Sequence, residues 1–134
     1  MGKRTLAVLT AVAGVMVAAC SSRPQASPEE LAAQAAKLYY DALAYGQPEQ
    51  WVMGHAGADT LPAEYRQLLL ENAHMFLAKQ LRLHGGIADV AVADQRSQWT
   101  PYGPIAVLTL CFADATQETI AVPMTEEDGQ WKIK

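Results

Sequence analysis

The sequence predicts one α+β domain in which three helices precede three or four antiparallel strands. Apolar residues recur at helical spacing as far as Gly85-Gly86, and beyond these glycines they alternate with a period of two. Helices and strands that are segregated along the chain in this way are typical of the α+β class.

A first helix is expected to begin at Ser27-Pro28-Glu29-Glu30. This sequence supplies a capping hydroxyl, a proline in the first turn and a glutamate that can complete a capping box. Gly46 should end the helix. Its apolar face is predicted to contain five residues at helical spacing: Leu31, Ala35, Leu38, Ala42 and Tyr45.

Two further helices are expected before Gly85-Gly86. A short one should run from Pro48 to about Gly54 and bury Trp51 and Val52. A long one should run from about Pro62 to His84, and the strands are expected to bury one face against it. Its apolar stripe is predicted to contain Tyr65, Leu68, Leu69, Asn72, Phe76 and Leu83.

Strands are expected at residues 87–97, 105–113, 119–125 and 131–134. The second is apolar on both faces, as in a central strand that is covered on each side. Asp128-Gly129 should form a hairpin turn that leads to Trp131 and Ile133 on the inner face.

The segment from Trp99 to Pro104 is aromatic and rich in proline and glycine. It is interpreted either as a rigid hairpin connection or as an exposed rim for contact with a partner or ligand. On the second interpretation, Trp99 and Tyr102 are the candidate contact residues.

The first twenty residues have the parts of a secretory signal peptide. Lys3-Arg4 precedes an uncharged run of fourteen residues, Leu6–Ala19, which is shorter than the roughly 17 to 25 residues of a transmembrane helix. Val17-Ala18-Ala19-Cys20 resembles the lipobox of bacterial lipoproteins. The resemblance implies cleavage before Cys20, a diacylglyceryl group on its thiol and an acyl chain on its amine. A plain secreted protein is the alternative.

This resemblance divides the chain into a signal peptide (1–19), a lipidated tether (20–26) and a single domain (27–134). In lipoproteins of Gram-negative bacteria, Ser21 in place of aspartate after Cys20 favours the outer membrane, with the domain facing the periplasm. A Gram-positive source would instead place the chain on the outer face of its only membrane. Loss of Lys3 and Arg4 lowers the net charge from −4 to −6. A chain this acidic, without a basic cluster, is not expected to bind nucleic acid, and lipid is its expected membrane attachment.

From about Ser27 to Lys134, the order of elements resembles the cystatin-like or nuclear-transport-factor-2-like cone, in which helices pack into a curved antiparallel sheet. The chain is also similar to small bacterial lipoproteins that carry a domain of unknown function from this superfamily. Three features support the resemblance: the lipobox, a Ser-Pro-Glu-Glu helix that ends at Tyr45-Gly46, and the terminal Asp128-Gly129-Gln130-Trp131-Lys132-Ile133. Such cones include enzymes, binding proteins and scaffolds, so the fold alone does not specify the function.

The resemblance implies that an enzyme of this fold would use an Asp, Tyr or His inside the cone. The candidates are Tyr39, Tyr40, Asp41, Tyr65, His74, Asp89 and Tyr102. Adjacent residues such as Tyr40 and Asp41 point about 100° apart on a helix and do not form a dyad by themselves. We therefore expect no catalytic site.

No metal site and no cofactor beyond the acyl chains are expected. His55, His74 and His84 lack the spacing of a zinc site. His84 should instead interact with the dipole at the end of its helix. Cys111, within an apolar run, is predicted to be a small buried hydrophobic residue.

The sequence thus favours a non-catalytic lipoprotein that binds an envelope protein or a small apolar ligand. The alternatives are an isomerase- or hydrolase-like enzyme and a purely structural surface protein. A buried carboxylate or histidine with an oriented partner would favour the enzyme, a dry apolar cavity would favour the ligand, and a filled core would favour protein interaction.

Overall fold

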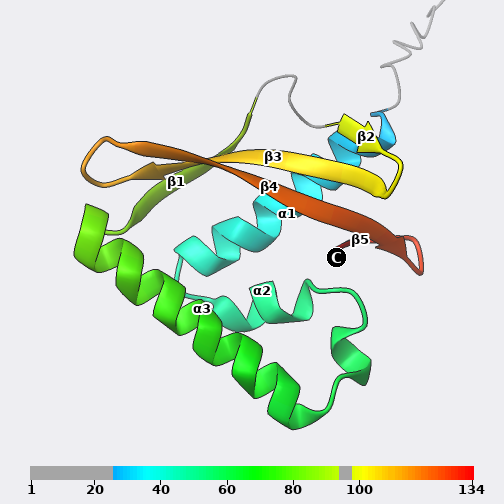
Figure 1. Cartoon of the computed structure of the whole chain (residues 1–134), viewed down its shortest axis with the longest axis horizontal. Helices are drawn as coiled ribbons and strands as arrows, with labels where there is room; N and C mark the ends of the chain where they lie inside the picture. Colours follow the sequence, from blue (N-terminus) through cyan, green and yellow to red (C-terminus); the bar gives the residue numbers. More distant parts are fainter. Residues whose placement is uncertain (1–25, 94–97) are drawn as a thin grey trace, which may run out of the picture.

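A curled antiparallel sheet with helices packed on one face makes up the fold (Figure 1). The structure is a computed structural model and describes residues 26–93 and 98–134. The predicted signal peptide, Cys20 and nearly all of the tether therefore lie outside the described residues.

The helices are α1 (Pro28–Ala44), α2 (Pro48–Met53), the 3₁₀ turn η1 (Ala58–Thr60) and α3 (Ala63–His84). The predicted cap of α1 is confirmed, because Ser27 Oγ accepts a hydrogen bond of 3.2 Å from the backbone N–H of Glu30. The predicted stop of α3 is also confirmed. Gly85 adopts a φ of 76°, a left-handed conformation that favours glycine.

The strands are β1 (Ile87–Val92), β2 (Gln98–Thr100), β3 (Gly103–Phe112), β4 (Gln117–Glu127) and β5 (Gln130–Ile133). The sheet order is β1-β3-β4-β5, and β2 also pairs with β3. Because Val92 pairs with Leu108 and Gln98 pairs with Ile105, β1 and β2 follow one another along the same edge of β3. The sheet thus has a short extra strand where the sequence indicated a connection.

Helix α1 covers the sheet with its alanine face. Ala32, Ala33 and Ala36 are buried and belong to the same core as the inward residues of the sheet. Those inward residues include Val90, Ala106, Leu108, Leu110, Phe112, Val122, Met124 and Ile133.

The apolar face predicted for α1 is correct only in part: Ala42 is buried and Ala35 packs against the core, but the three larger residues do not face inward. Leu31, Leu38 and Tyr45 are exposed, with Leu38 at 68%. The small alanine side chains let the helix backbone approach the sheet closely, so the alanine face packs inward and the longer side chains stay outside.

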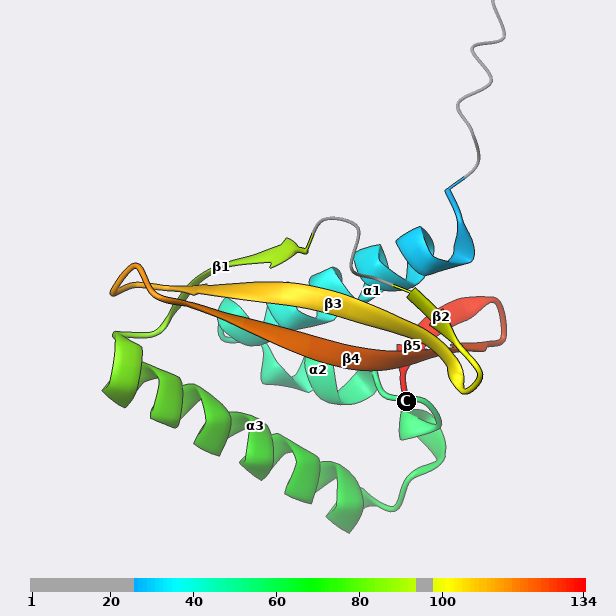
Figure 2. The same cartoon turned by 45° about the horizontal axis from the view of Figure 1, so that its top comes forward.

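Helix α3 does not cover the sheet as predicted. It lies beyond α1 and α2 (Figure 2), packs mainly against α2, and reaches the sheet at β1 and at Phe112 of β3, on which His84 stacks. Its fully buried side chains are Ala73 and Gln80, whereas Tyr65, Leu68 and Leu83 of the predicted stripe are exposed. The sheet face that α3 was expected to bury is already occupied by α1.

Strand β3 is covered on one face in the described part of the chain, not on both. Its even-numbered residues are buried, and its odd-numbered residues, from Ile105 to Cys111, are half-buried. Cys111 was expected to be buried but is a half-buried free thiol on this second face.

The C-terminal hairpin agrees with the prediction. Asp128 and Gly129 adopt φ values of 51° and 77°, as a tight turn between two strands requires. Ile133 is buried, and its backbone N–H donates to Gly54 O at 2.8 Å, which ties β5 to the end of α2. Among the described helices, none combines the length and apolar character needed to cross a membrane.

Candidate functional site

The residues considered for catalysis are dispersed over four parts of the fold. Tyr39, Tyr40 and Asp41 lie on α1, Tyr65 and His74 on α3, Asp89 on β1, and Tyr102 in the β2–β3 turn. Tyr65, His74, Asp89 and Tyr102 are exposed. Within residues 26–93 and 98–134, no hydrogen bond or ion pair joins any two of the seven.

Two of the three candidates on α1 have structural partners. The Tyr39 hydroxyl donates to Trp131 O at 2.7 Å, which links α1 to β5, and burial raises the pKa of Tyr39. Asp41 accepts from Lys37 Nζ at 2.6 Å across one helical turn, and this contact raises the pKa of Lys37.

Trp99 and Tyr102 lie in the hairpin predicted as a partner-contact loop. Both are exposed, Tyr102 to 84%. Strand β2 of this hairpin lies at the end of the molecule where α1 begins (Figure 1). Thr100 Oγ1 donates to Gly103 O at 2.7 Å, and Lys134 Nζ donates to Tyr102 O at 3.0 Å. These bonds hold the turn in place, while its two aromatic side chains extend into solvent.

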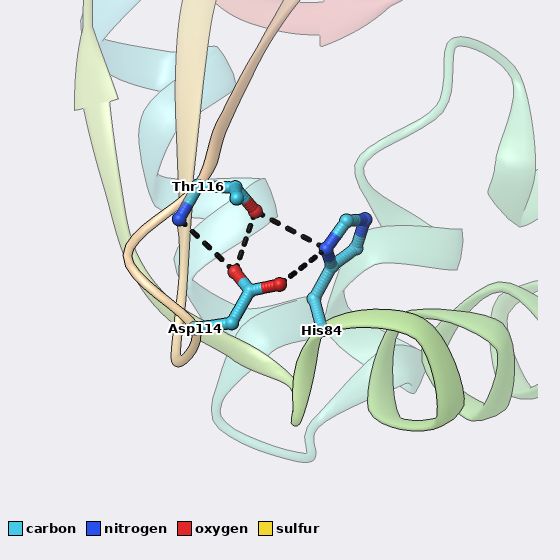
Figure 3. A network of polar contacts seen from close by, with 3 residues as sticks. All are labelled: His84, Asp114 and Thr116. Carbon is cyan, nitrogen blue, oxygen red and sulfur yellow. Dashed lines mark hydrogen bonds and ion pairs between the residues drawn. The ribbon is translucent and has the colours of Figure 1, made fainter.

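A polar network that the sequence did not predict joins the end of α3 to the β3–β4 turn (Figure 3). His84 Nδ1 lies 2.8 Å from Asp114 Oδ2 and 3.1 Å from Thr116 Oγ1. The Thr116 hydroxyl and backbone N–H both donate to Asp114 Oδ1. The His84 ring also stacks on Phe112, with centroids 4.2 Å apart.

This network is not arranged as a nucleophile–base pair. In a catalytic triad the acid and the nucleophile contact different nitrogens of the histidine. Here Asp114 and Thr116 contact the same nitrogen of His84, and the Thr116 hydroxyl donates to Asp114. The hydrogen bonds from Thr116 and His84 lower the pKa of Asp114 to about 2. The arrangement fits a structural link between helix and hairpin.

A more suitable candidate site is a pocket between the three helices. Tyr40 and Leu43 come from α1, Trp51 from α2, and three residues from α3. We call this the three-helix pocket. Its volume is about 130 Å³, and it is lined by Tyr40, Leu43, Trp51, Asn72, Ala73 and Phe76.

Trp51 is held between two rings at one side of this pocket. Its ring makes edge-to-face contacts with Tyr40, at a centroid distance of 6.4 Å, and with His55, at 4.4 Å. His55 Nδ1 lies 2.9 Å from Trp51 O and 3.2 Å from Val52 O. Since both partners are acceptors, we assign the ring proton of His55 to Nδ1.

The polar atoms of the three-helix pocket are incompletely bonded. In the described part of the chain, Trp51 Nε1 is buried and has no hydrogen-bond partner. Burial raises the pKa of the Tyr40 hydroxyl, and the nearby Trp51 indole partly opposes that rise. The geometry between Trp51 Nε1 and this hydroxyl is nevertheless not that of a hydrogen bond. The pocket is therefore apolar, with a buried donor that lacks an acceptor.

Next to the pocket, one exposed face of α3 carries four large apolar side chains, with the polar residues Asn72 and Lys79 between them. Tyr65, Leu68, Met75 and Leu83 have exposed fractions of 61%, 51%, 69% and 55%. Their positions fall within about 80° around the helix, at 100° per residue. We call these four residues the α3 face.

Shallow hollows flank α3. One of about 440 Å³ is lined by Met75, Phe76, Ala78, Lys79 and Arg82, and it shares Phe76 with the three-helix pocket. Another, of about 240 Å³, lies between α2 and α3 and is lined by Glu49, Val52, Met53, Ala63, Arg66, Gln67 and Leu70. Lys79 and Arg82 make no ion pair with any described residue.

A metal site would require a group of side chains that could bind the ion together. Throughout the described residues, no group of three or more His, Cys, Asp or Glu side chains has an arrangement that could hold a metal ion.

Comparison with known proteins bears on the fold. No family model matches the sequence, and no curated protein matches it. Among solved structures, the chain is similar to a protein from Campylobacter jejuni described as an NTF2-like transpeptidase, with a TM-score of 0.59 and 13% sequence identity. The match covers 75% of this chain and 94% of the other. The chain has an NTF2-like fold.

The predicted cone is thereby confirmed, and the identity is too low to carry an activity from one protein to the other. The sequence places Tyr40, Trp51 and Phe76 on separate predicted helices and does not indicate that they meet. Their spacing gave no signal, because the pocket forms only when α3 packs beside α1 and α2.

Proposed function

We propose that this protein is an outer-membrane lipoprotein, anchored through Cys20, whose NTF2-like domain binds another envelope protein without catalysing a reaction. The observation that supports it best is the α3 face. Four large apolar side chains are more than half exposed on one helix, beside an apolar pocket. Exposed apolar clusters of this kind mark interaction sites.

The position of the α3 face relative to the expected anchor supports a partner in the periplasm. The chain enters α1 at one end of the molecule, and α3 lies on the opposite side in both views (Figures 1 and 2). The seven residues from Cys20 to Ala26 span at most about 25 Å. A tether this short would keep the start of α1 near the membrane and turn the α3 face away from it.

The packing favours a protein partner over a small ligand enclosed in the cone. The space between α1 and the sheet is filled, since Leu108 and Leu110 are fully buried and Met124 is 1% exposed. The apolar hollows lie instead along α3, where a partner can cover them. We expect that partner to present apolar side chains with acidic residues beside them, because Lys79 and Arg82 flank the hollow next to Met75.

An acyl-transfer activity, suggested by the name of the structural neighbour, receives less support. Acyl transfer requires a nucleophile activated by a base. The nearest arrangement in the described residues is Thr116 beside His84, and there the hydroxyl proton is directed to Asp114.

The anchor is tested with Cys20→Ser. Metabolic labelling with a fatty acid, followed by membrane fractionation, should show loss of acylation and release of the domain from the membrane. A variant that still fractionates with the membrane would refute the lipid anchor. Cys111→Ser is the matched control and should leave labelling and fractionation unchanged.

The partner is tested with a photo-crosslinking amino acid placed at Met75 in intact cells. Gln34, an exposed residue of α1, serves as the control position. We expect a discrete adduct from position 75 and none from position 34. Absence of an adduct at 75, or the same adduct from both positions, would contradict a binding role for the α3 face.

A further inference from the structure

We infer that the three-helix pocket receives the anchoring side chain of the partner, an aromatic ring or a branched aliphatic group, and that Trp51 Nε1 donates to a neutral carbonyl beside it. This inference rests on the proposed function and specifies the chemistry of its recognition site.

The size of the pocket fits one side chain. Its volume is about 130 Å³, close to the roughly 150 Å³ of an engineered apolar cavity that binds benzene. Leu43, Ala73 and Phe76 supply apolar walls, and Tyr40 and Trp51 supply aromatic ones. A phenylalanine or leucine side chain would replace unfavourable empty space with van der Waals contact.

The polar chemistry of the pocket indicates what accompanies that side chain. A buried N–H without an acceptor is unfavourable, and an incoming acceptor oxygen relieves the penalty. Trp51 Nε1 is such a donor, and the indole N–H donates but does not accept. The pocket lining contains no Lys or Arg, so a neutral carbonyl fits it better than a carboxylate.

The location of the pocket connects it to the α3 face. Phe76 belongs both to the pocket and to the hollow that contains Met75, Lys79 and Arg82. A partner segment lying on the α3 face can therefore place one side chain into the pocket. Interfaces commonly concentrate their binding energy in one such buried anchor.

The test uses N-acetylphenylalaninamide, which has one aromatic ring and neutral carbonyls, and follows binding by NMR chemical shifts. With the native chain, we expect weak saturable binding and nuclear Overhauser contacts from the ligand ring to the Ala73 methyl and the Phe76 ring. N-acetylglycinamide, which lacks the ring, should not bind. Contacts confined to other residues would overturn the inference without any variant.

Two variants test the separate parts of the inference. Ala73→Leu should fill the pocket and abolish binding, whereas Ala121→Leu, at an exposed position on β4, should leave it unchanged. Trp51→Phe should weaken binding of N-acetylphenylalaninamide about fivefold, the effect of one lost hydrogen bond. Toluene, which has no acceptor, should bind Trp51→Phe no more weakly than the native chain.

Equal binding to the native chain and to folded Ala73→Leu would overturn the pocket assignment. If Trp51→Phe weakened the binding of N-acetylphenylalaninamide and of toluene equally, the proposed contact between Trp51 Nε1 and a carbonyl would be overturned. If position 75 still forms a crosslinked adduct in cells while the amide does not enter the pocket, this inference fails and the proposed function stands.

Discussion

His84 and Asp114, thirty residues apart, connect the last turn of the longest helix to the turn between β3 and β4. The side chains meet at 2.8 Å between Nδ1 and Oδ2, and the backbone N–H of Asp114 donates to His84 O at 3.1 Å. Since α3 is otherwise weakly attached to the sheet, this double link fixes where its C-terminal end lies.

Replacing the carboxylate should loosen that end of α3. In Asp114→Asn, the charge-assisted bond from His84 is replaced by a weaker neutral one. We expect the amide protons of Gly85 and Gly86 to exchange a few-fold faster by hydrogen-exchange NMR, with little change in the core. Glu118→Gln, an exposed acid on β4, is the control. Unchanged exchange at both glycines would show that the side-chain contact does not stabilise the helix end.

The same pair should contribute a pH dependence that is confined to acid. The pKa of Asp114 is lowered from its ordinary value of 3.8 to about 2. Because the pKa of Asp114 is lower in the folded state than in the unfolded state, its ionised form stabilises the fold at any pH above the ordinary pKa. This contribution to stability is lost as the pH falls from about 4 through about 2. Urea denaturation of the native chain and Asp114→Asn should show a stability difference at neutral pH that disappears near pH 2. A difference that persists unchanged at pH 2 would count against the lowered pKa.

The inward face of α1 can be tested with two substitutions two residues apart. Ala36 is fully buried, so Ala36→Leu should overpack the core and destabilise the fold by about 1–3 kcal/mol. Leu38 is 68% exposed, so Leu38→Ala should change the free energy of unfolding by less than about 0.5 kcal/mol. Urea denaturation measures both changes in the free energy of unfolding. A larger loss from Leu38→Ala than from Ala36→Leu would support the inward face that was expected from the sequence.

Gly54 is predicted to be intolerant of any side chain. Its φ is ordinary, at −73°, but an added Cβ would lie 2.5 Å from Cδ1 of the Tyr39 ring. Gly54→Ala should displace that ring, disturb the hydrogen bond from Tyr39 to Trp131 O, and destabilise the fold by roughly 1–3 kcal/mol.

A double-mutant cycle identifies the cause of the effect at Gly54. In a Tyr39→Leu background the ring is absent, so adding Gly54→Ala should produce a clearly smaller loss of thermal stability. Strictly additive losses would mean that the glycine is required for another reason.

The sequence was most informative where a local conformation decides the outcome. The cap at Ser27, the stop at Gly85 and the turn at Asp128-Gly129 depend on a few neighbouring residues, and all three occur as predicted. The order of helices and strands also predicted the α+β class, and the NTF2-like cone implied by the family resemblance is the fold that the structure shows.

The sequence was less informative about which helix face turns inward. Helix α1 has apolar residues on more than one face, and the choice between Leu38 and Ala36 depends on how closely the sheet approaches. The pocket residues Tyr40, Trp51 and Phe76 come from three helices, so no local pattern connects them. The link between His84 and Asp114 likewise depends on the path of the whole chain.

Binding of an envelope protein by the α3 face can be measured in intact cells as the adduct formed from a photo-crosslinker at position 75, with and without Leu68→Glu. Leu68 is 51% exposed, so this change should leave the fold intact while placing a charge at the contact. We expect an adduct with a protein other than a second copy of this chain, reduced at least about fivefold by Leu68→Glu. An adduct of twice the mass of the chain, or one that Leu68→Glu leaves unchanged, would show that the α3 face does not bind an envelope protein.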